Sequence, residues 1–90
     1  MSLNQKTVLL VEDDSVDALT VKRAFSDLNI TNPLVHVTNG EEALQYLNNP
    51  DNPRPCVILS DLNMPKMNGI ELLAELKKDA LLKKIPFIAL

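Results

Sequence analysis

The stretch of sequence that decides the fold is VILSDLNMPKMNG, residues 57–69. Its first three residues are apolar and a serine follows them, as in a short strand that is buried on both faces. Asp61 comes directly after this run, and the residues that follow it include a proline and a glycine. Charged side chains are rarely left at the edge of a core without a partner or a task. We therefore expect the rest of the chain to supply one or the other for Asp61.

Length and composition are those of one small domain. The chain has 90 residues, of which 46% are hydrophobic and 23% are charged, and these fractions are ordinary for a globular protein. The formal net charge is -3 and no basic cluster is present, so direct nucleic-acid binding is not expected. No apolar stretch approaches the roughly 20 residues of a membrane span. The single cysteine, Cys56, excludes an internal disulfide and favours a reducing, cytoplasmic location.

Short apolar runs alternate with amphipathic segments along the chain. Strands are expected at residues 7–11, 34–37, 56–60 and 86–90, and helices at about 14–28, 41–47 and 69–78. Inward-facing positions are expected at Val16, Leu19, Ala24, Phe25 and Leu28 in the first helix, and at Ile70, Leu73 and Leu76 in the third. Apolar strands that alternate with helices predict an α/β fold, a doubly wound parallel sheet with right-handed crossovers and helices on both faces.

Acidic residues follow two of the expected strands. Glu12, Asp13 and Asp14 come after the first strand, and Asp61 comes after the third. Ligands of parallel α/β sheets bind beyond the carboxyl ends of the strands, so these acids meet if the two strands are neighbours. Several carboxylates in one crevice repel each other unless they are protonated or paired. A hard divalent cation removes this conflict, and Mg²⁺, which binds carboxylate, water and phosphate oxygens, fits best.

Three motifs together resemble the receiver domain of two-component response regulators. They are LLVEDD at 9–14, SDLNMPKMNG at 60–69 and KKIPFIAL at 83–90, and their order and separations match the family over nearly the whole chain. The chain is similar in particular to small stand-alone receivers that serve phytochrome-type or hybrid histidine kinases. The resemblance implies a flavodoxin-like sheet with strand order 2-1-3-4-5. It also implies a phosphoryl donor, either a histidine kinase or a histidine phosphotransfer protein. A homodimer is possible, and direct contact with nucleic acid or with a membrane is not expected.

The resemblance assigns roles to four residues of the site. Asp61 would be the phosphoacceptor and Asp13 a direct Mg²⁺ ligand. Glu12 would hold the metal through a water molecule, and Asn63 would offer its backbone carbonyl. A carboxylate is a competent nucleophile towards a phosphohistidine when Mg²⁺ shields its charge. We expect no enzyme activity beyond phosphorylation and dephosphorylation of the protein itself.

Several of these residues have a plainer interpretation. An acidic doublet after a strand is often only a solvated loop and helix cap, and we interpret Asp14 as such a cap. Pro65 and Gly69 are expected to shape the loop and no more. Three further residues are expected to be structural: His36 as a half-buried histidine, Cys56 as a small core residue and Met67 as a loop or packing residue.

The family pattern also has parts that these 90 residues do not include. Receivers place a Thr or Ser at the end of the fourth strand and a Lys after a fifth strand, whereas this sequence ends at Leu90. We therefore expect a single domain, residues 1–90, cut within its fourth strand, with the fifth strand missing. Two alternatives remain for the function. A Mg²⁺-dependent phosphohydrolase would want a second aspartate where Asn63 stands, and a degenerate receiver acting as a protein-binding module would not need Glu12, Asp13 and Asp61 together.

Overall fold

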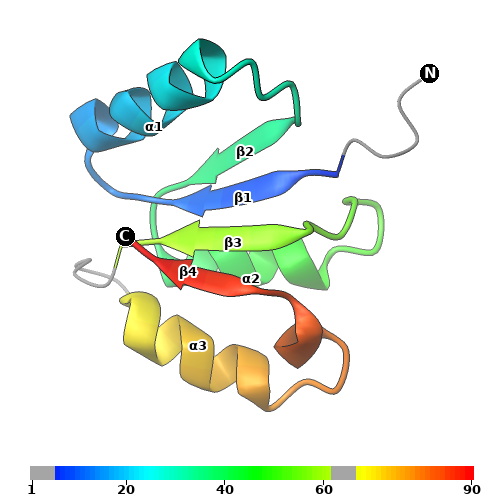
Figure 1. Ribbon diagram of the computed structural model, residues 1–90. Coiled ribbons are helices and arrows are strands. Elements are labelled where there is room, and N and C mark those ends of the chain that lie inside the picture. Colours follow the sequence, from blue (N-terminus) through cyan, green and yellow to red (C-terminus); the bar gives the residue numbers. More distant parts are fainter. Residues whose placement is uncertain (1–5, 62–66) are drawn as a thin grey trace.

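The four apolar segments form one parallel sheet, as the sequence predicts (Figure 1). A computed structural model describes residues 6–61 and 67–90 of the chain. The elements in chain order are β1 (Val8–Val11), α1 (Ser15–Asp27), β2 (Leu34–Val37), α2 (Gly40–Asn48), β3 (Val57–Ser60), α3 (Gly69–Lys77), the short 3-10 helix η1 (Leu82–Lys84) and β4 (Phe87–Ala89). The expected strands and helices are all present, and their ends differ from the expected ones by at most one residue.

The strand order β2-β1-β3-β4 makes β1 a central strand. All four residues of β1 are buried, which explains why this strand is apolar throughout. Val11, its last residue, pairs with Val37 of β2 and with Ser60 of β3. All three strand pairs are parallel, so every strand ends at the same edge of the sheet. This order and direction confirm the expected doubly wound, flavodoxin-like arrangement for the four strands.

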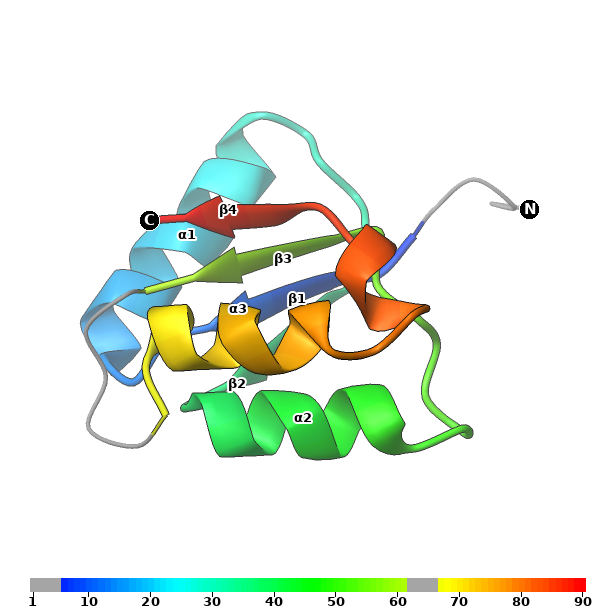
Figure 2. The same cartoon turned by 90° about the horizontal axis from the view of Figure 1, so that it is seen from below.

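Helices cover both faces of the sheet. Figure 2 shows α2 and α3 together on one face and α1 on the other. The main core lies under α2 and α3, and its buried members are Leu9, Val11, Ala43, Ile58, Leu72, Leu76, Leu82 and Ile85. Fully burying one such aliphatic side chain stabilises the fold by about 1.5–3 kcal/mol. This face therefore supplies most of the stability that holds the ends of β1 and β3 in place.

The expected inward face of α1 is wrong. Val16, Leu19 and Leu28 are exposed by 68%, 45% and 70%, and Ala24 is exposed as well. Only Ala18 of this helix is buried, while Phe25 is half-buried. The reason is that no other helix of the described residues lies on this face (Figure 2), so only a narrow stripe of α1 contacts the sheet. Periodicity cannot reveal how many neighbours a helix has.

The inward face of α3 is also shifted from the expected one. Leu72 and Leu76 are buried, whereas Ile70 is 65% exposed and Leu73 is half-buried. Gly69, Leu72 and Leu76 are three and four residues apart, so they share one side of the helix. Ile70 lies outside that side because each residue turns the helix by about 100°.

The predictions for Cys56 and His36 have different outcomes. Cys56 is exposed, so the core position expected for it is wrong. It directly precedes β3, and although its N–H donates to the carbonyl oxygen of Thr7 at 2.9 Å, the residue remains exposed. His36 is half-buried, as expected, and its Nε2 lies 2.8 Å from the backbone carbonyl oxygen of Glu12. None of the helices within residues 6–61 and 67–90 combines the length and apolar content that crossing a bilayer requires.

Candidate metal and phosphoacceptor site

The strand register brings the acidic residues to one place. Val11 and Ser60 are partners across β1 and β3, and Glu12 and Asp61 are the residues that follow them. The N–H of Asp61 donates to the carbonyl oxygen of Val11 at 3.0 Å, and the N–H of Glu12 donates to that of Val37 at 3.0 Å. The backbone at this edge is thus fixed by sheet hydrogen bonds beyond the last residue of each strand. The expectation that the acids meet at this edge is confirmed.

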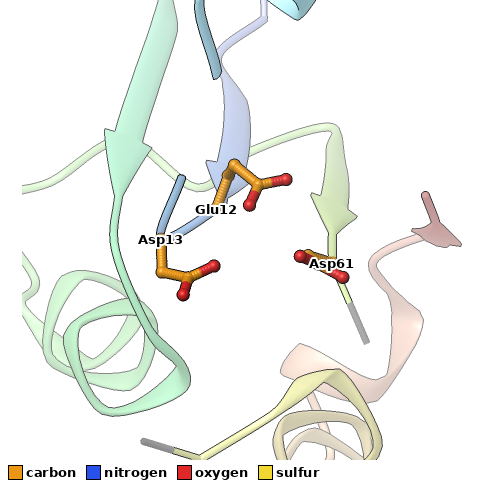
Figure 3. A group of neighbouring side chains, drawn as sticks. All are labelled: Glu12, Asp13 and Asp61. Carbon is orange, nitrogen blue, oxygen red and sulfur yellow. The ribbon is translucent and has the colours of Figure 1, made fainter. Parts of the chain in front are cut away.

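Three carboxylates face a common space (Figure 3). Glu12, Asp13 and Asp61 each offer a carboxylate oxygen, and these oxygens all lie within 4.8 Å of one another. Oxygens on opposite sides of one Mg²⁺ ion are about 4 Å apart, since each Mg–O distance is about 2.0–2.1 Å. A small inward movement would therefore bring the oxygens to ligand distance. Glu12 is 3% exposed, Asp61 is half-buried and Asp13 is exposed, so the site also has an open side for water ligands.

Burial and the neighbouring carboxylate of Asp61 raise the pKa of Glu12 to about 7. The largest cause is burial, which disfavours the charged carboxylate. The negative charge of Asp61 and a hydrogen bond between the two side chains raise the pKa further, and Asp17 adds a smaller repulsion. The N–H of Asp14 acts in the opposite direction, because it donates to Oε2 of Glu12 at 3.1 Å. Without a cation, this group of acids is therefore under electrostatic strain near neutral pH.

Asp14 is a helix cap, as expected. Its Oδ1 accepts hydrogen bonds from the N–H groups of Val16 and Asp17, at 2.8 and 3.2 Å. Its carboxylate is thereby directed to the first turn of α1, whose unpaired N–H groups it satisfies. The acidic run after β1 thus divides into two residues at the shared space and one that starts the helix.

Asn63, Pro65 and Gly69 are also expected at the site or in its loop. Asn63 and Pro65 lie outside the described residues. Gly69 is the first residue of α3 and is buried. No described glycine has a positive φ, and the left-handed residue before α3 is Met67, with a φ of 42°. Met67 packs against the core cluster, which confirms it as a packing residue.

A cavity of about 280 Å³ lies beside the acids, lined by Glu12, Asp17, Thr20, Val21, Asp61 and Leu90. Asp17 and Thr20, three residues apart in α1, are the polar lining residues that the sequence interpretation did not include. Their spacing in the first turns of a helix that starts at the site is the signal that could have found them. The cavity leaves open space next to the Asp61 carboxylate. A larger cavity, of about 440 Å³, is lined by residues between Lys22 and Leu34 and includes none of the site acids.

The chain matches the family model of the response regulator receiver domain over residues 8–90. It is 38% identical to the response regulator Rcp1 of Synechocystis over 89 residues of the alignment, and the match covers 94% of this chain and 60% of Rcp1. A crystal structure of the phosphorylated cyanobacterial phytochrome response regulator RcpA has 38% identity and a TM-score of 0.85, over 94% of this chain and 64% of that one. The Mn²⁺-bound form of Rcp1 has 38% identity and a TM-score of 0.86, over 93% and 63%.

These matches extend over nearly all of the described sheet and helices. The chain spans about 60% of the length of Rcp1 and 56% of a second curated relative, the probable methanogenesis regulatory protein FilR2 of Methanothrix harundinacea. The matched region runs from β1 to β4 and so contains Glu12, Asp13 and Asp61. The chain belongs to the receiver domain family of two-component response regulators.

Proposed function

We propose that the protein receives a phosphoryl group on the carboxylate of Asp61 from a phosphohistidine, with Mg²⁺ held by the neighbouring acids. The observation that supports this best is the convergence of one oxygen each from Glu12, Asp13 and Asp61 within 4.8 Å. Asp61 is half-buried, whereas Glu12 is buried, and Asp61 borders a cavity that Asp13 does not line. We therefore propose Asp61 as the acid of this group that both contacts a metal and reaches an incoming phosphorus atom.

The transfer needs an oxygen nucleophile and charge neutralisation. A carboxylate oxygen of Asp61 would bond to phosphorus as the bond from phosphorus to the donor's histidine nitrogen breaks, and the donor keeps that electron pair. Mg²⁺, when bound, supplies the positive charge that offsets the approach of two anions. Asp13, which is exposed, would contact the ion directly, and buried Glu12 would hold one of its water ligands. Asn63 would add its backbone carbonyl.

Receiver domains are signalling domains and are generally not enzymes, and we propose no turnover of a separate substrate here. A phosphohydrolase of the type that uses a strand-end aspartate would need a second acid at position 63, which is an asparagine. A degenerate receiver would not need three acids in one place, so their convergence disfavours that alternative. The related response regulator Rcp1 has a Mn²⁺-bound form, which supports a divalent cation in this protein, and the carboxylate ligands favour Mg²⁺.

The same comparisons support a proposal for the phosphoryl donor. Relatives of this chain include a cyanobacterial phytochrome response regulator and bacteriophytochrome response regulators. We propose a phytochrome-type histidine kinase, or a histidine phosphotransfer protein, as the donor, and a cytoplasmic location. The homodimer and the lack of nucleic-acid and membrane contacts remain predictions.

The direct test replaces the nucleophile while preserving its size. The protein is treated with a small phosphoryl donor and Mg²⁺, or with beryllofluoride as a mimic, and uptake is measured by mass spectrometry and radiolabel. Wild type should take up one group, and Asp61→Asn should take up none. Asp14→Asn is the matched control, since asparagine is an equally good helix cap and Asp14 lies outside the acid group. Unchanged uptake by Asp61→Asn would refute the assignment.

A further inference from the structure

The turn between β2 and α2 contacts the segment that follows Asp61. Gly40 is the first residue of α2 and is buried. Its N–H donates to the carbonyl oxygen of Met67 at 3.0 Å. Figure 2 shows the first turn of α2 beside the chain that leads into α3. The β2–α2 turn contributes no carboxylate to the group of acids at the site. The first residue of α2 nevertheless binds Met67, which lies six positions after Asp61 in the sequence.

The contact depends on the absence of a side chain at residue 40. A Cβ placed on Gly40 would lie 2.6 Å from the carbonyl oxygen and from Cγ of Met67, and 2.9 Å from its Cβ. A rotation of the Met67 side chain would relieve only the Cγ contact. The φ of Gly40 is not positive, so its own backbone conformation does not require glycine. Alanine would even suit the helix better, so the close approach of Met67 is the feature that requires glycine here.

The α2 side of the contact is rigidly held. Asn39 caps the helix, with its Oδ1 accepting from the N–H of Glu42 at 2.9 Å. Oε1 of Glu42 accepts in turn from the N–H and the hydroxyl of Thr38, at 2.7 and 2.8 Å. The N–H of Gly40 belongs to the first turn, which has no acceptor within the helix. Met67 supplies that acceptor, so the contact also completes the hydrogen bonding of α2.

The Met67 side of the contact is held as well. Its φ of 42° lies in the left-handed region, which residues other than glycine and asparagine rarely adopt. Such conformations persist where the surrounding contacts determine them, and they are frequent at functional sites. The side chain of Met67 packs against the core cluster, and the next residue, Asn68, forms a capping box with Glu71 at the start of α3.

We propose that Gly40 is a positioning residue for the phosphoacceptor site. By holding Met67 against the first turn of α2, it fixes the far end of the segment that starts at Asp61, whose own N–H is bonded to Val11. The inference rests on the proposed function, because it concerns the geometry of the Mg²⁺ site. A side chain at position 40 would displace Met67 and alter the geometry around Asp61 without touching any of the three acids.

The test compares Gly40→Ala with wild type and with Glu41→Ala, which places an alanine at the next, exposed position of the same helical turn. Mg²⁺ affinity is measured by calorimetry, and phosphoryl uptake by its rate, at a temperature where circular dichroism shows each variant folded. Gly40→Ala should raise the Kd for Mg²⁺ by about fivefold or more and slow phosphoryl uptake. Glu41→Ala should match wild type. A purely structural role would lower the melting temperature of Gly40→Ala and leave the Kd unchanged, and that result would overturn the proposal.

A double-mutant cycle shows whether the effect passes through Met67. Met67→Gly removes the Cβ and Cγ that Gly40→Ala would strike, and glycine accepts a positive φ without strain. Gly40→Ala should therefore weaken Mg²⁺ binding less in the Met67→Gly background than in wild type. Equal effects in the two backgrounds would mean that residue 40 does not act through the side chain of Met67, and this part of the proposal would fail.

A measurement on the wild-type protein serves if Gly40→Ala does not fold. Linkage requires that, if the contact favours Mg²⁺ binding, Mg²⁺ favours the contact to the same extent. Saturating Mg²⁺ should therefore slow hydrogen exchange at the Gly40 amide more than at the Ala43 amide, which is bonded within α2 to the Asn39 carbonyl. Equal slowing at both amides would reflect global stabilisation and refute the proposal.

The proposed function and the positioning role of Gly40 can be refuted separately. A wild-type protein that neither binds Mg²⁺ nor accepts a phosphoryl group would refute both. A wild-type protein that does both, with Gly40→Ala equal to it in Mg²⁺ affinity and uptake, would refute the positioning role alone.

Discussion

Glu12→Gln should stabilise the metal-free protein at alkaline pH much more than in acid. Glu12 is 3% exposed as a residue, and the pKa of its carboxyl group is raised from 4.5 to about 7, first by burial and then by Asp61. A difference of this size between the unfolded and folded pKa corresponds to about 3 kcal/mol of stability. This cost arises because the folded protein must hold a buried charge beside a second carboxylate.

The sign follows from which state loses its proton first. Below pH 4.5 the carboxyl group is protonated in both states, so it costs nothing. Between pH 4.5 and about 7 the unfolded chain releases the proton and the folded protein keeps it, so stability falls as the pH rises. Above pH 7 the cost is complete. A glutamine has no charge to lose, and its carbonyl can still accept from the N–H of Asp14, which lies 3.1 Å from Oε2 of Glu12.

The assay is urea unfolding followed by circular dichroism, with a chelator present, at pH 5 and pH 8. The stability advantage of Glu12→Gln over wild type should grow by about 2–3 kcal/mol between these two values. Glu41→Gln is the matched control, because Glu41 is exposed on α2, and its effect should change by less than about 1 kcal/mol. The same advantage at both pH values would mean that Glu12 is already ionised at pH 5 in the folded protein. The crowded site inferred for the metal-free state would then be wrong.

Two further predictions concern the metal and the sheet edge. Mg²⁺ at 100 times its Kd should stabilise the folded protein by about 2.7 kcal/mol. Asp13→Asn should raise the stability of the metal-free protein and abolish this stabilisation by Mg²⁺. If neither Mg²⁺ nor the substitution changes the melting temperature, the acids share no site. A polypeptide of residues 1–90 should associate in size-exclusion chromatography, because β4 pairs only with β3 within the described residues and Ile88 and Leu90 are 50% and 54% exposed. A monomer with cooperative melting would contradict this.

The sequence predicts the sheet better than it predicts the helix surfaces. The buried strands β1 and β3 are apolar runs that end in acids, and parallel pairing alone brings Glu12 and Asp61 together. The inward faces of α1 and α3 depend instead on what lies beside each helix. Ile70 fits the helical period but is 65% exposed, because Leu72 and Leu76 occupy the side that faces the core. In short amphipathic helices the apolar pattern alone leaves this rotation undetermined.

The contact between Gly40 and Met67 shows a second limit of sequence interpretation. Asn39-Gly40 has the composition of an ordinary turn and helix start, and nothing local indicates that Gly40 meets a residue 27 positions later in the sequence. A contact of this kind depends on the strand order, since β1 lies between β2 and β3. Only after the three strands are placed do their three connections come close enough to bind one another.

The three connections at this edge have different physical tasks. The β1–α1 connection supplies Glu12 and Asp13, which repel Asp61 in the absence of a cation. The β2–α2 connection contributes no charge to this group and holds Met67 through Gly40. A site that gathers negative charge tends to open, because separation of the carboxylates lowers their repulsion. A neutral contact that fixes the chain after Asp61 opposes this opening without adding charge. Its disruption should therefore weaken Mg²⁺ binding most where Glu12 is ionised, above about pH 7.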